Sequence, residues 1–286
     1  MIAGAGADIF TRIGGDPSAP PVLLLHGYPQ TSAMWDRIAV DLAQDFRVVC
    51  TDLRGYGQSE KPKSAPDHAP YSKRAMAADM VAVMAALEHE RFCVGAHDRG
   101  GRVAHRLGLD HVGVVQAMTI LDIAPTREMY ANTTDAFARA YWHWFYLIQE
   151  HPFPEQMIGL DPDAFWTKKC IGLGGGKHPF SKAAKAEYME AFRKESVIHA
   201  SCEDYRAAAT IDIAHDDADE GRKLTMPLEV YWAKNGVVDR CFDPLALWRL
   251  RAERVSGEAL PGSHYFAEET PEVFAQKFRA HFQKHV

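Results

Sequence analysis

Short apolar runs recur in the first half of the chain and again near its end, and each predicts a buried strand. A continuous run without polar alternation is typical of a strand that is covered on both faces. An alternating stretch predicts an outer strand at residues 8–14, and a short strand is expected at 255–260. The continuous runs occupy residues 21–25, 46–50, 92–94, 117–123 and 227–232.

Apolar residues at helical spacing fill most of the intervals between these runs. In the segment 72–87, for example, Met76, Met80, Val83 and Leu87 would share one helix face. Strands that alternate with helices favour an α/β fold with a doubly wound, mostly parallel sheet. The other helices expected in this part of the chain are 32–44, 102–109, 244–252 and 271–285.

The pattern changes between residues 130 and 220, where no clear strand is found. Aromatic residues and helical spacing dominate this stretch, which predicts a helical insertion over the active edge of the sheet. Helices are expected at 161–170, 181–196 and 198–209. The resulting division is an α/β core domain, residues 1–130 and 221–286, and a helical cap (lid) domain, residues 131–220.

Two further stretches of the cap segment are interpreted as loops. The glycine-rich stretch 172–178 fails as a phosphate-binding loop, because His178 stands where Ser or Thr would bind Mg²⁺ and no buried strand precedes it. We expect a flexible lid loop there. The acidic run 216–220 is interpreted as a solvated turn where the cap rejoins the core.

Composition and charge narrow the class of protein further. The formal net charge is −6 and no basic stripe is present, which argues against a nucleic-acid partner. The five cysteines form no CxxC pair, and Cys50 and Cys93 lie in strand-like runs, so buried, reduced thiols are expected. The chain begins without a convincing signal peptide, and no apolar run reaches the roughly 18 residues of a membrane span. A cytoplasmic enzyme is therefore expected.

The segment around Asp98 has the layout of a nucleophile elbow. An apolar run, small residues, Asp98, Gly100 and a helix-like segment follow one another, as in a tight turn that raises one side chain above a parallel sheet. A carboxylate in this position can attack sp³ carbon and form an alkyl-enzyme ester. Asp98 is therefore the candidate nucleophile.

A base and its partner acid follow in chain order. His264 lies in a Gly-Ser-His-Tyr loop before the last helix, where it could activate water, and Asp122 ends a buried strand, where it could orient His264. Asp239, after the strand 227–232, competes for the role of Asp122; we prefer Asp122. The backbone N–H groups of Tyr28 and Arg99 are the candidate oxyanion donors.

Two arginines indicate the class of substrate. Arg99 and Arg102 are three residues apart at the start of a helix, so both can face the side of Asp98. A buried arginine without an anionic partner is costly, and a substrate carboxylate is the simplest partner for the pair. The alternative is that Arg102 pairs with an acid of the core or of the cap.

These motifs, taken together, resemble those of the α/β-hydrolases. A narrower resemblance, to the haloacetate dehalogenases and to fluoroacetate dehalogenases in particular, is carried by Asp-Arg-Gly-Gly-Arg at 98–102, Leu-Asp-Ile at 121–123, His143 with Trp144, and Cys-Glu-Asp-Tyr-Arg-Ala at 202–207. The broader resemblance is carried by the segments 26–29, 52–59, 95–101 and 262–264.

The resemblance implies hydrolysis of a haloacetate to glycolate and halide, without metal or other cofactor. It implies that Asp98 is the nucleophile, with His264 as base and Asp122 as its partner, and that Arg99 and Arg102 grip the carboxylate of a small anionic haloacid. By the same resemblance, His143, Trp144 and Tyr205 donate hydrogen bonds to the departing halide, and the enzyme is a homodimer.

Two rival functions stay open. An epoxide hydrolase would share the Asp nucleophile and the His base, but would need two cap tyrosines as proton donors. The candidates are Tyr130, Tyr141, Tyr188 and Tyr205. The two arginines suit a small anion better than a neutral epoxide. A ligand-binding sensor with this fold is the rival of another class, and the Asp–His–Asp set argues against it.

Overall fold

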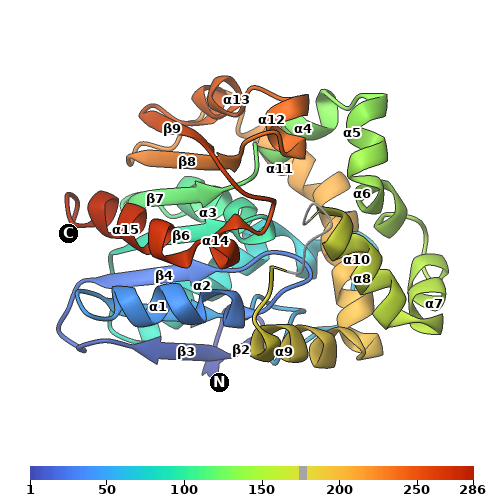
Figure 1. The fold of residues 1–286 in the computed structure, drawn as a ribbon, viewed down its shortest axis with the longest axis horizontal. Coiled ribbons are helices and arrows are strands. Elements are labelled where there is room, and N and C mark those ends of the chain that lie inside the picture. The colour runs from blue at the N-terminus through green and yellow to red at the C-terminus, as the bar shows by residue number, and fades with distance from the viewer. Residues whose placement is uncertain (174–178) are drawn as a thin grey trace.

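A central sheet organises the computed structural model, which describes residues 1–173 and 179–286 (Figure 1). Within the described residues the sheet has seven strands in the order β3-β5-β4-β6-β7-β8-β9, and only the pairing of β3 with β5 is antiparallel. The bounds are β3 (Thr11–Gly14), β4 (Pro21–Leu25), β5 (Arg47–Thr51), β6 (Phe92–His97), β7 (Val115–Leu121), β8 (Leu228–Ala233) and β9 (Val255–Leu260), and a separate ribbon pairs β1 (Ile2–Ala3) with β2 (Asp8–Ile9).

The middle strands carry the polar residues of interest at their carboxyl ends. Every residue of β6 is buried, in agreement with the continuous apolar run that predicts it. Leu25 is opposite Ala96 on the neighbouring strand, so His26 and Asp98 leave the sheet at the same edge. Asp122 follows the last residue of β7 directly. Ligands of such sheets bind beyond this edge.

Helices cover both faces of the sheet, so the predicted doubly wound α/β architecture is confirmed. In Figure 1, α1 (Asp36–Leu42) and α15 (Pro271–Phe282) pack together in front of the sheet, and α2 (Lys73–Ala86) and α3 (Arg99–Asp110) pack together behind it. The remaining elements of this part are η1 (Ser32–Trp35), η2 (Ala69–Tyr71), α12 (Val237–Cys241), α13 (Pro244–Arg251) and α14 (Phe266–Glu269). Helix α3 begins three residues before its predicted start, so Arg99 opens the helix.

Between β7 and β8 the described residues form helices alone, and these gather beside the carboxyl edge of the sheet, at the right of Figure 1. They are α4 (Thr126–Ala131), α5 (Asp135–Ala140), α6 (Trp142–Leu147), α7 (Phe153–Leu160), α8 (Pro162–Leu173), α9 (Lys182–Phe192), α10 (Glu195–Ala209) and α11 (Ile211–Ala218). The division into a core domain and a cap domain, with boundaries at 130/131 and 220/221, stays a prediction. The predicted lid loop at 172–178 lies largely outside the described residues.

The prediction of a solvated turn at 216–220 is wrong. Asp216 belongs to α11, and both Asp216 and Asp219 are buried against Arg106 of α3. Arg106 Nη2 is 2.8 Å from Asp216 Oδ1, and its Nη1 is 2.5 Å from Asp219 Oδ2. A buried guanidinium needs counter-charge, and this run supplies it across more than 100 residues of chain.

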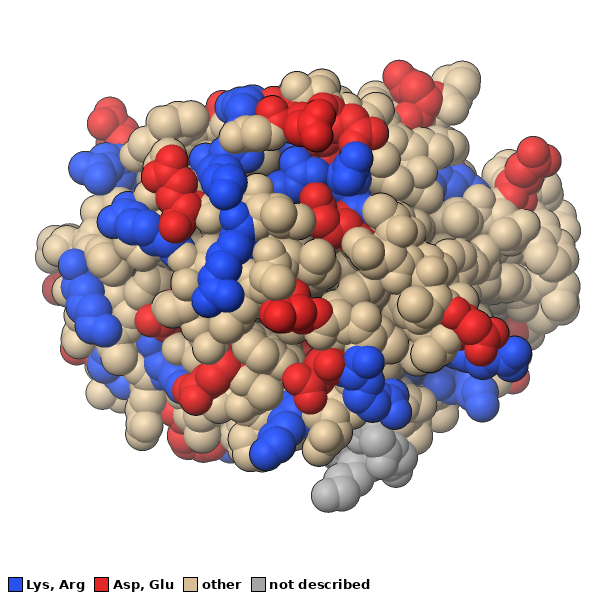
Figure 2. All heavy atoms as spheres, turned by 90° about the horizontal axis from the view of Figure 1, so that it is seen from above, with Lys and Arg blue, Asp and Glu red and all other residues tan. Residues whose placement is uncertain are grey.

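Surface charge and thiols agree with the sequence expectations. Figure 2 shows acidic and basic side chains interspersed on one face of the molecule, without a basic stripe on that face. The cysteines are free, and Cys50 and Cys93 are buried as predicted. No helix among the described residues combines the length and the apolar character that crossing a membrane requires.

Candidate active site

Asp98 stands on a strained turn between β6 and α3, as the elbow pattern predicts. Its φ of 46° is unusual for a residue with a Cβ, and the surroundings are tight. A Cβ on Gly100 would lie 2.4 Å from the Leu25 carbonyl oxygen, and one on Gly27 would lie 2.6 Å from the Asp98 Cβ. Glycine at both positions lets the two loops approach, and the Tyr28 N–H donates to Asp98 Oδ1 at 2.9 Å.

His264 and Asp122 meet beside this carboxylate. His264 Nδ1 is 2.6 Å from Asp122 Oδ2, and Asp122 Oδ1 accepts from the Ala233 N–H at 2.8 Å. The other ring nitrogen, His264 Nε2, is 3.9 Å from Asp98 Oδ2. The structure therefore brings the three predicted residues together, with the His264 imidazole between the carboxylates of Asp98 and Asp122.

Asp239, the competing acid, does not contact His264. Its Oδ1 accepts from Trp232 Nε1 at 2.7 Å and its Oδ2 from the Asn235 N–H at 2.8 Å, at the half-exposed start of α12. Both of its oxygens are thus occupied in shaping the turn after β8. The geometry favours Asp122 as the partner of His264.

The surroundings of Asp98 keep its carboxyl group ionised. Burial alone would raise the pKa of Asp98, but the positive fields of His264, Lys169, His97 and Arg102 outweigh burial and hold that pKa below its usual range. An ionised carboxylate is the nucleophilic form, because its lone pairs are free to attack carbon.

Arg99 differs from the sequence expectation, because its charge is already compensated. Its Nε donates to Asp204 Oδ2 at 2.8 Å and its Nη2 to Asp204 Oδ1 at 2.7 Å, while the guanidinium lies 4.1 Å from the Tyr205 ring centre. Asp204 comes from α10 and also accepts from Lys73 and Tyr56. Only Arg99 Nη1 remains buried without a hydrogen-bond partner in the described structure. Arg99 therefore does not need a substrate anion to balance its charge, and its predicted contact with a substrate carboxylate stays a prediction.

The alternative for Arg102, an ion pair with an acid of the core or of the cap, is not found among the described residues. Its Nη1 donates to Thr126 Oγ1 at 2.9 Å and to the Ala124 carbonyl at 3.2 Å, and its Nη2 donates to Met129 Sδ at 3.4 Å, so its acceptors among the described residues include no carboxylate. The guanidinium lies 4.6 Å from the Trp144 ring centre. Burial and the charge of Arg99 lower the pKa of Arg102. Arg102 is thus a buried cation that forms no ion pair with the described residues.

The three predicted halide donors lie close to one another, beside Arg102. His143 and Trp144 come from α6 and Tyr205 from α10, and the Tyr205 ring centre is 5.8 Å from that of His143 and 6.4 Å from that of Trp144. The indole N–H and the phenol O–H are buried, and neither has a hydrogen-bond partner among the described residues. Burial lowers the pKa of His143, so a neutral ring with one N–H is expected.

Lys169 and Asp204 are the site residues that the sequence analysis missed. Lys169, on α8, is buried and donates to the Tyr28 carbonyl at 2.7 Å and to the Tyr265 hydroxyl at 3.1 Å. Its position three residues after Trp166 places it on the apolar face of the predicted helix, which was the available signal. Asp204 was visible only as the neighbour of Tyr205, because its pairing with Arg99 spans 105 residues.

Known proteins resemble this chain over most of its length. A family model described as the alpha/beta hydrolase fold matches residues 20–251. A fluoroacetate dehalogenase from Burkholderia sp is 44% identical over 93% of this chain and 88% of its own. A soluble epoxide hydrolase from Corynebacterium sp. (strain C12) is 29% identical over 89% and 87%. A crystal structure from Nostoc sp PCC 7120, assigned to the alpha/beta hydrolases, is 48% identical with a TM-score of 0.95, covering 98% and 96% of the two chains.

Proposed function

This chain belongs to the α/β-hydrolases and, within them, to the haloacetate dehalogenase family of hydrolases that act on carbon–halide bonds, and we propose from that premise that it converts fluoroacetate- and chloroacetate-type 2-haloacids to glycolate-type products and halide. The observation that carries the proposal is Arg102, a buried guanidinium without an acid partner among the described residues, whose field reaches Asp98. A carboxylate of the substrate would supply the missing anion. No metal or other cofactor takes part in the proposed route.

The first step is attack by Asp98. Because the Tyr28 N–H holds Oδ1, the free Oδ2 is the attacking oxygen. Its lone pair forms a bond to the carbon that bears the halogen, and the carbon–halogen bond breaks with its electron pair on the halide. Trp144 Nε1–H and Tyr205 O–H, which have no hydrogen-bond partner among the described residues, would donate to that halide together with His143. Fluoride is a poor leaving group, so directed donors matter most for it.

The second step is hydrolysis of the resulting ester. His264 Nε2 takes a proton from water, whose oxygen attacks the Asp98 carbonyl carbon, while Asp122 stabilises the imidazolium. The negative charge forms on Oδ1, which the N–H groups of Tyr28 and Arg99 would hold. Collapse releases the product with Oδ2 as its hydroxyl oxygen, and the imidazolium returns the proton.

Release of halide ion tests the proposal. Wild-type protein is expected to release fluoride from fluoroacetate, chloride from chloroacetate and chloride from 2-chloropropionate, measured by ion chromatography beside an Asp98→Asn control. Halide from none of the three substrates would reject the proposal, whether or not the acids bind.

Epoxide hydrolysis is the second candidate, because the Corynebacterium relative carries that name and cap tyrosines are present. The hydroxyls of Tyr130 and Tyr205 are buried and have no partner in the described part of the chain. Tyr188 already donates to Glu268 at 2.9 Å, and the Tyr141 hydroxyl lies 3.5 Å from His264 Nδ1. Diol formation from a styrene-type epoxide, without halide release from haloacids, would favour this candidate. Binding of either ligand without turnover would favour a sensor.

We also propose a homodimer, which rests on the family resemblance alone, and a cytoplasmic location, which rests on the composition of the chain.

A further inference from the structure

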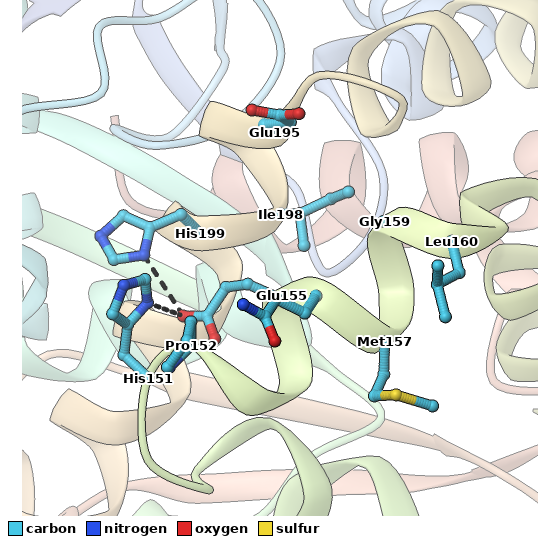
Figure 3. Close-up of a pocket in the computed structure, with 10 residues that line it drawn as sticks. His151, Pro152, Glu155, Met157, Gly159, Leu160, Glu195, Ile198 and His199 are labelled. Carbon is cyan, nitrogen blue, oxygen red and sulfur yellow. Dashed lines mark hydrogen bonds and ion pairs between the residues drawn. The ribbon is translucent and has the colours of Figure 1, made fainter.

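Three side chains of types that bind metal ions lie close together on the helical segment, apart from the residues around Asp98. His151 precedes α7, Glu155 lies in its first turn, and His199 faces them from α10 (Figure 3). Each offers one ligand atom, and these atoms lie within 4.8 Å of one another. The three side chains stand at one end of a surface hollow that also contains Met157 and Leu160.

The two rings already turn the same nitrogen toward the same oxygen. His151 Nδ1 is 3.3 Å and His199 Nδ1 is 3.2 Å from Glu155 Oε1, and the dashed lines of Figure 3 mark both contacts. The ring centres are 5.3 Å apart and the angle between the rings is 75°, so both Nδ1 atoms can face one small ion beside Glu155 Oε1. We propose that His151, Glu155 and His199 form a binding site for a divalent transition-metal ion of the Zn²⁺ type, independent of the dehalogenase site.

The residues that contact the three proposed ligands also suit a metal site. His199 Nε2 is 3.1 Å from Ser64 Oγ, and a partner on the second nitrogen is what orients a metal-binding histidine. Arg206 Nη2 lies 3.1 Å from Glu155 Oε2, so that oxygen can keep the guanidinium while Oε1 turns to the ion. Glu155 Oε1 now accepts from Arg206 Nη1 at 2.6 Å, a bond that the ion would replace. Arg206 retains Glu203 at 2.8 Å from the same nitrogen.

The local charge also permits a cation. Glu155 and Glu203 carry two negative charges against the single positive charge of Arg206, and Glu195 adds a carboxylate on the wall of the hollow. Two imidazoles and one carboxylate suit Zn²⁺ and its neighbours in the transition series, whereas Mg²⁺ and Ca²⁺ prefer oxygen ligands alone. With three protein ligands, a fourth position would face the solvent, because His151 is largely exposed.

Metal binding would connect α7 to α10. Helix α10 also carries Asp204, which holds Arg99, and Tyr205, so the ion would stabilise the packing of a helix that contributes to the dehalogenase site. The expected role is structural, since no ligand of the cluster belongs to the residues around Asp98.

Calorimetric titration with ZnCl₂ tests the site. We would use chain without an affinity tag, stripped with a chelator, in a Cys241→Ser background because Cys241 is the cysteine that is not buried. One Zn²⁺ per chain is expected to bind, and His151→Ala and His199→Ala are each expected to weaken binding at least about tenfold. His89→Ala, elsewhere on the surface, is the matched control and should bind as the parent does. MgCl₂ should give no binding.

Thermal unfolding gives a readout that does not depend on heat of binding. Zn²⁺ at roughly 100 times its Kd should raise the Tm of the parent and of His89→Ala by about 5 °C or more, and should leave the Tm of His199→Ala unchanged. Equal Zn²⁺ affinity in the parent and in a His151→Ala/His199→Ala double variant would overturn the proposal, as would the absence of saturable binding to the parent. Haloacid turnover is not involved in either result.

Discussion

The two arginines that open α3 are adjacent in the site but differ in what holds them. Arg99 has a bidentate carboxylate partner in Asp204, with Lys73 and Tyr56 on the same acid. Among the described residues, Arg102 donates to the Thr126 hydroxyl, the Ala124 carbonyl and the Met129 thioether sulfur, and to no carboxylate. Removal of Arg99 would take away the bidentate partner of the buried Asp204 carboxylate. Removal of Arg102 would leave no described carboxylate without an ion-pair partner. The two substitutions should therefore have different effects.

Arg102→Leu is expected to raise KM for chloroacetate roughly 10- to 100-fold, since a charge-assisted hydrogen bond contributes about 1.5–3 kcal/mol. Its Tm should stay close to that of the wild type. Arg99→Leu is expected to lower Tm by several degrees, because breaking a buried pair costs about 3–5 kcal/mol. Steady-state kinetics and calorimetry on the two variants measure both effects. An unchanged KM in folded Arg102→Leu would contradict the carboxylate contact.

Tyr205 should matter in proportion to how poorly the halide leaves. Its hydroxyl is buried without a partner in the described structure, so a departing halide is its proposed acceptor. Tyr205→Phe is expected to lower kcat/KM for fluoroacetate roughly 10- to 100-fold more than for bromoacetate, because bromide leaves readily without a donor. Tyr146→Phe, a half-buried tyrosine of α6, serves as the control. Equal losses on both substrates would exclude a halide role for Tyr205.

At the scale of elements, helices of the cap segment complete a site that begins on the sheet. Helix α8 reaches the core through Lys169, whose ammonium group holds the Tyr28 carbonyl and so the loop that carries the Tyr28 N–H. Helices α6 and α10 add the indole, imidazole and phenol groups. The candidate chemistry therefore depends on how these helices pack on the core.

Lys169→Met is expected to lower kcat about tenfold or more, because the Tyr28 N–H would lose its fixed position and one oxyanion donor is worth several kcal/mol. KM should change less, since Lys169 does not hold the proposed substrate carboxylate. Lys168→Met is the matched control, because Lys168 is the exposed neighbour on the same helix. The same kcat in both variants would show that Lys169 does not position the loop.

The helices and strands were largely predictable, because each depends on the pattern of residues within its own segment. Residues 92–97 form a strand because apolar and small residues are continuous there, and the tight turn at Asp98 is possible because Gly27 and Gly100 have no Cβ that would clash. The partners of charged residues were not predictable in the same way. Neither the pair Arg99–Asp204 nor the pairing of Arg106 with Asp216 follows from local pattern, because each forms only when α3 packs against the cap segment.

For the whole molecule, the sequence predicted which residues form the candidate site better than it predicted which charges there are paired. Asp98, Asp122 and His264 occur in a chain order that one fold uses, so their meeting could be expected from motifs. Lys169 belongs to no such motif, and its burial depends on how α8 packs on the loops after β4 and before α14. Tertiary packing thus decides which charges are compensated and which remain for a substrate.

The pH dependence of global stability should reflect one buried acid, Glu268. It accepts from Tyr188 at 2.9 Å and from Gln30, and burial raises its pKa to about 8 from its ordinary value of 4.5. The folded state therefore keeps this proton up to about pH 8, whereas the unfolded chain loses it near pH 4.5. Between these values stability falls as the pH rises, by about 1.4 kcal/mol per pH unit at most.

Glu268→Gln should remove this dependence. The Tm of the variant, relative to that of the wild type, is expected to increase from pH 5 to pH 8, because glutamine cannot ionise. Calorimetry across this pH range on Glu268→Gln and on Glu190→Gln, an exposed control, measures the difference. Parallel Tm curves for wild type and Glu268→Gln would show that Glu268 is ionised throughout.

The most direct test of the proposed function is to trap the ester on Asp98. Replacing His264 by glutamine should block hydrolysis but not attack, so the variant is expected to accumulate a covalent intermediate with chloroacetate or fluoroacetate. Peptide mass spectrometry should then find one carboxymethyl group on Asp98, together with one equivalent of released halide, and nothing in an Asp98→Asn/His264→Gln control. Halide release by the wild type with an unmodified Asp98 in the trapped variant would contradict the covalent route.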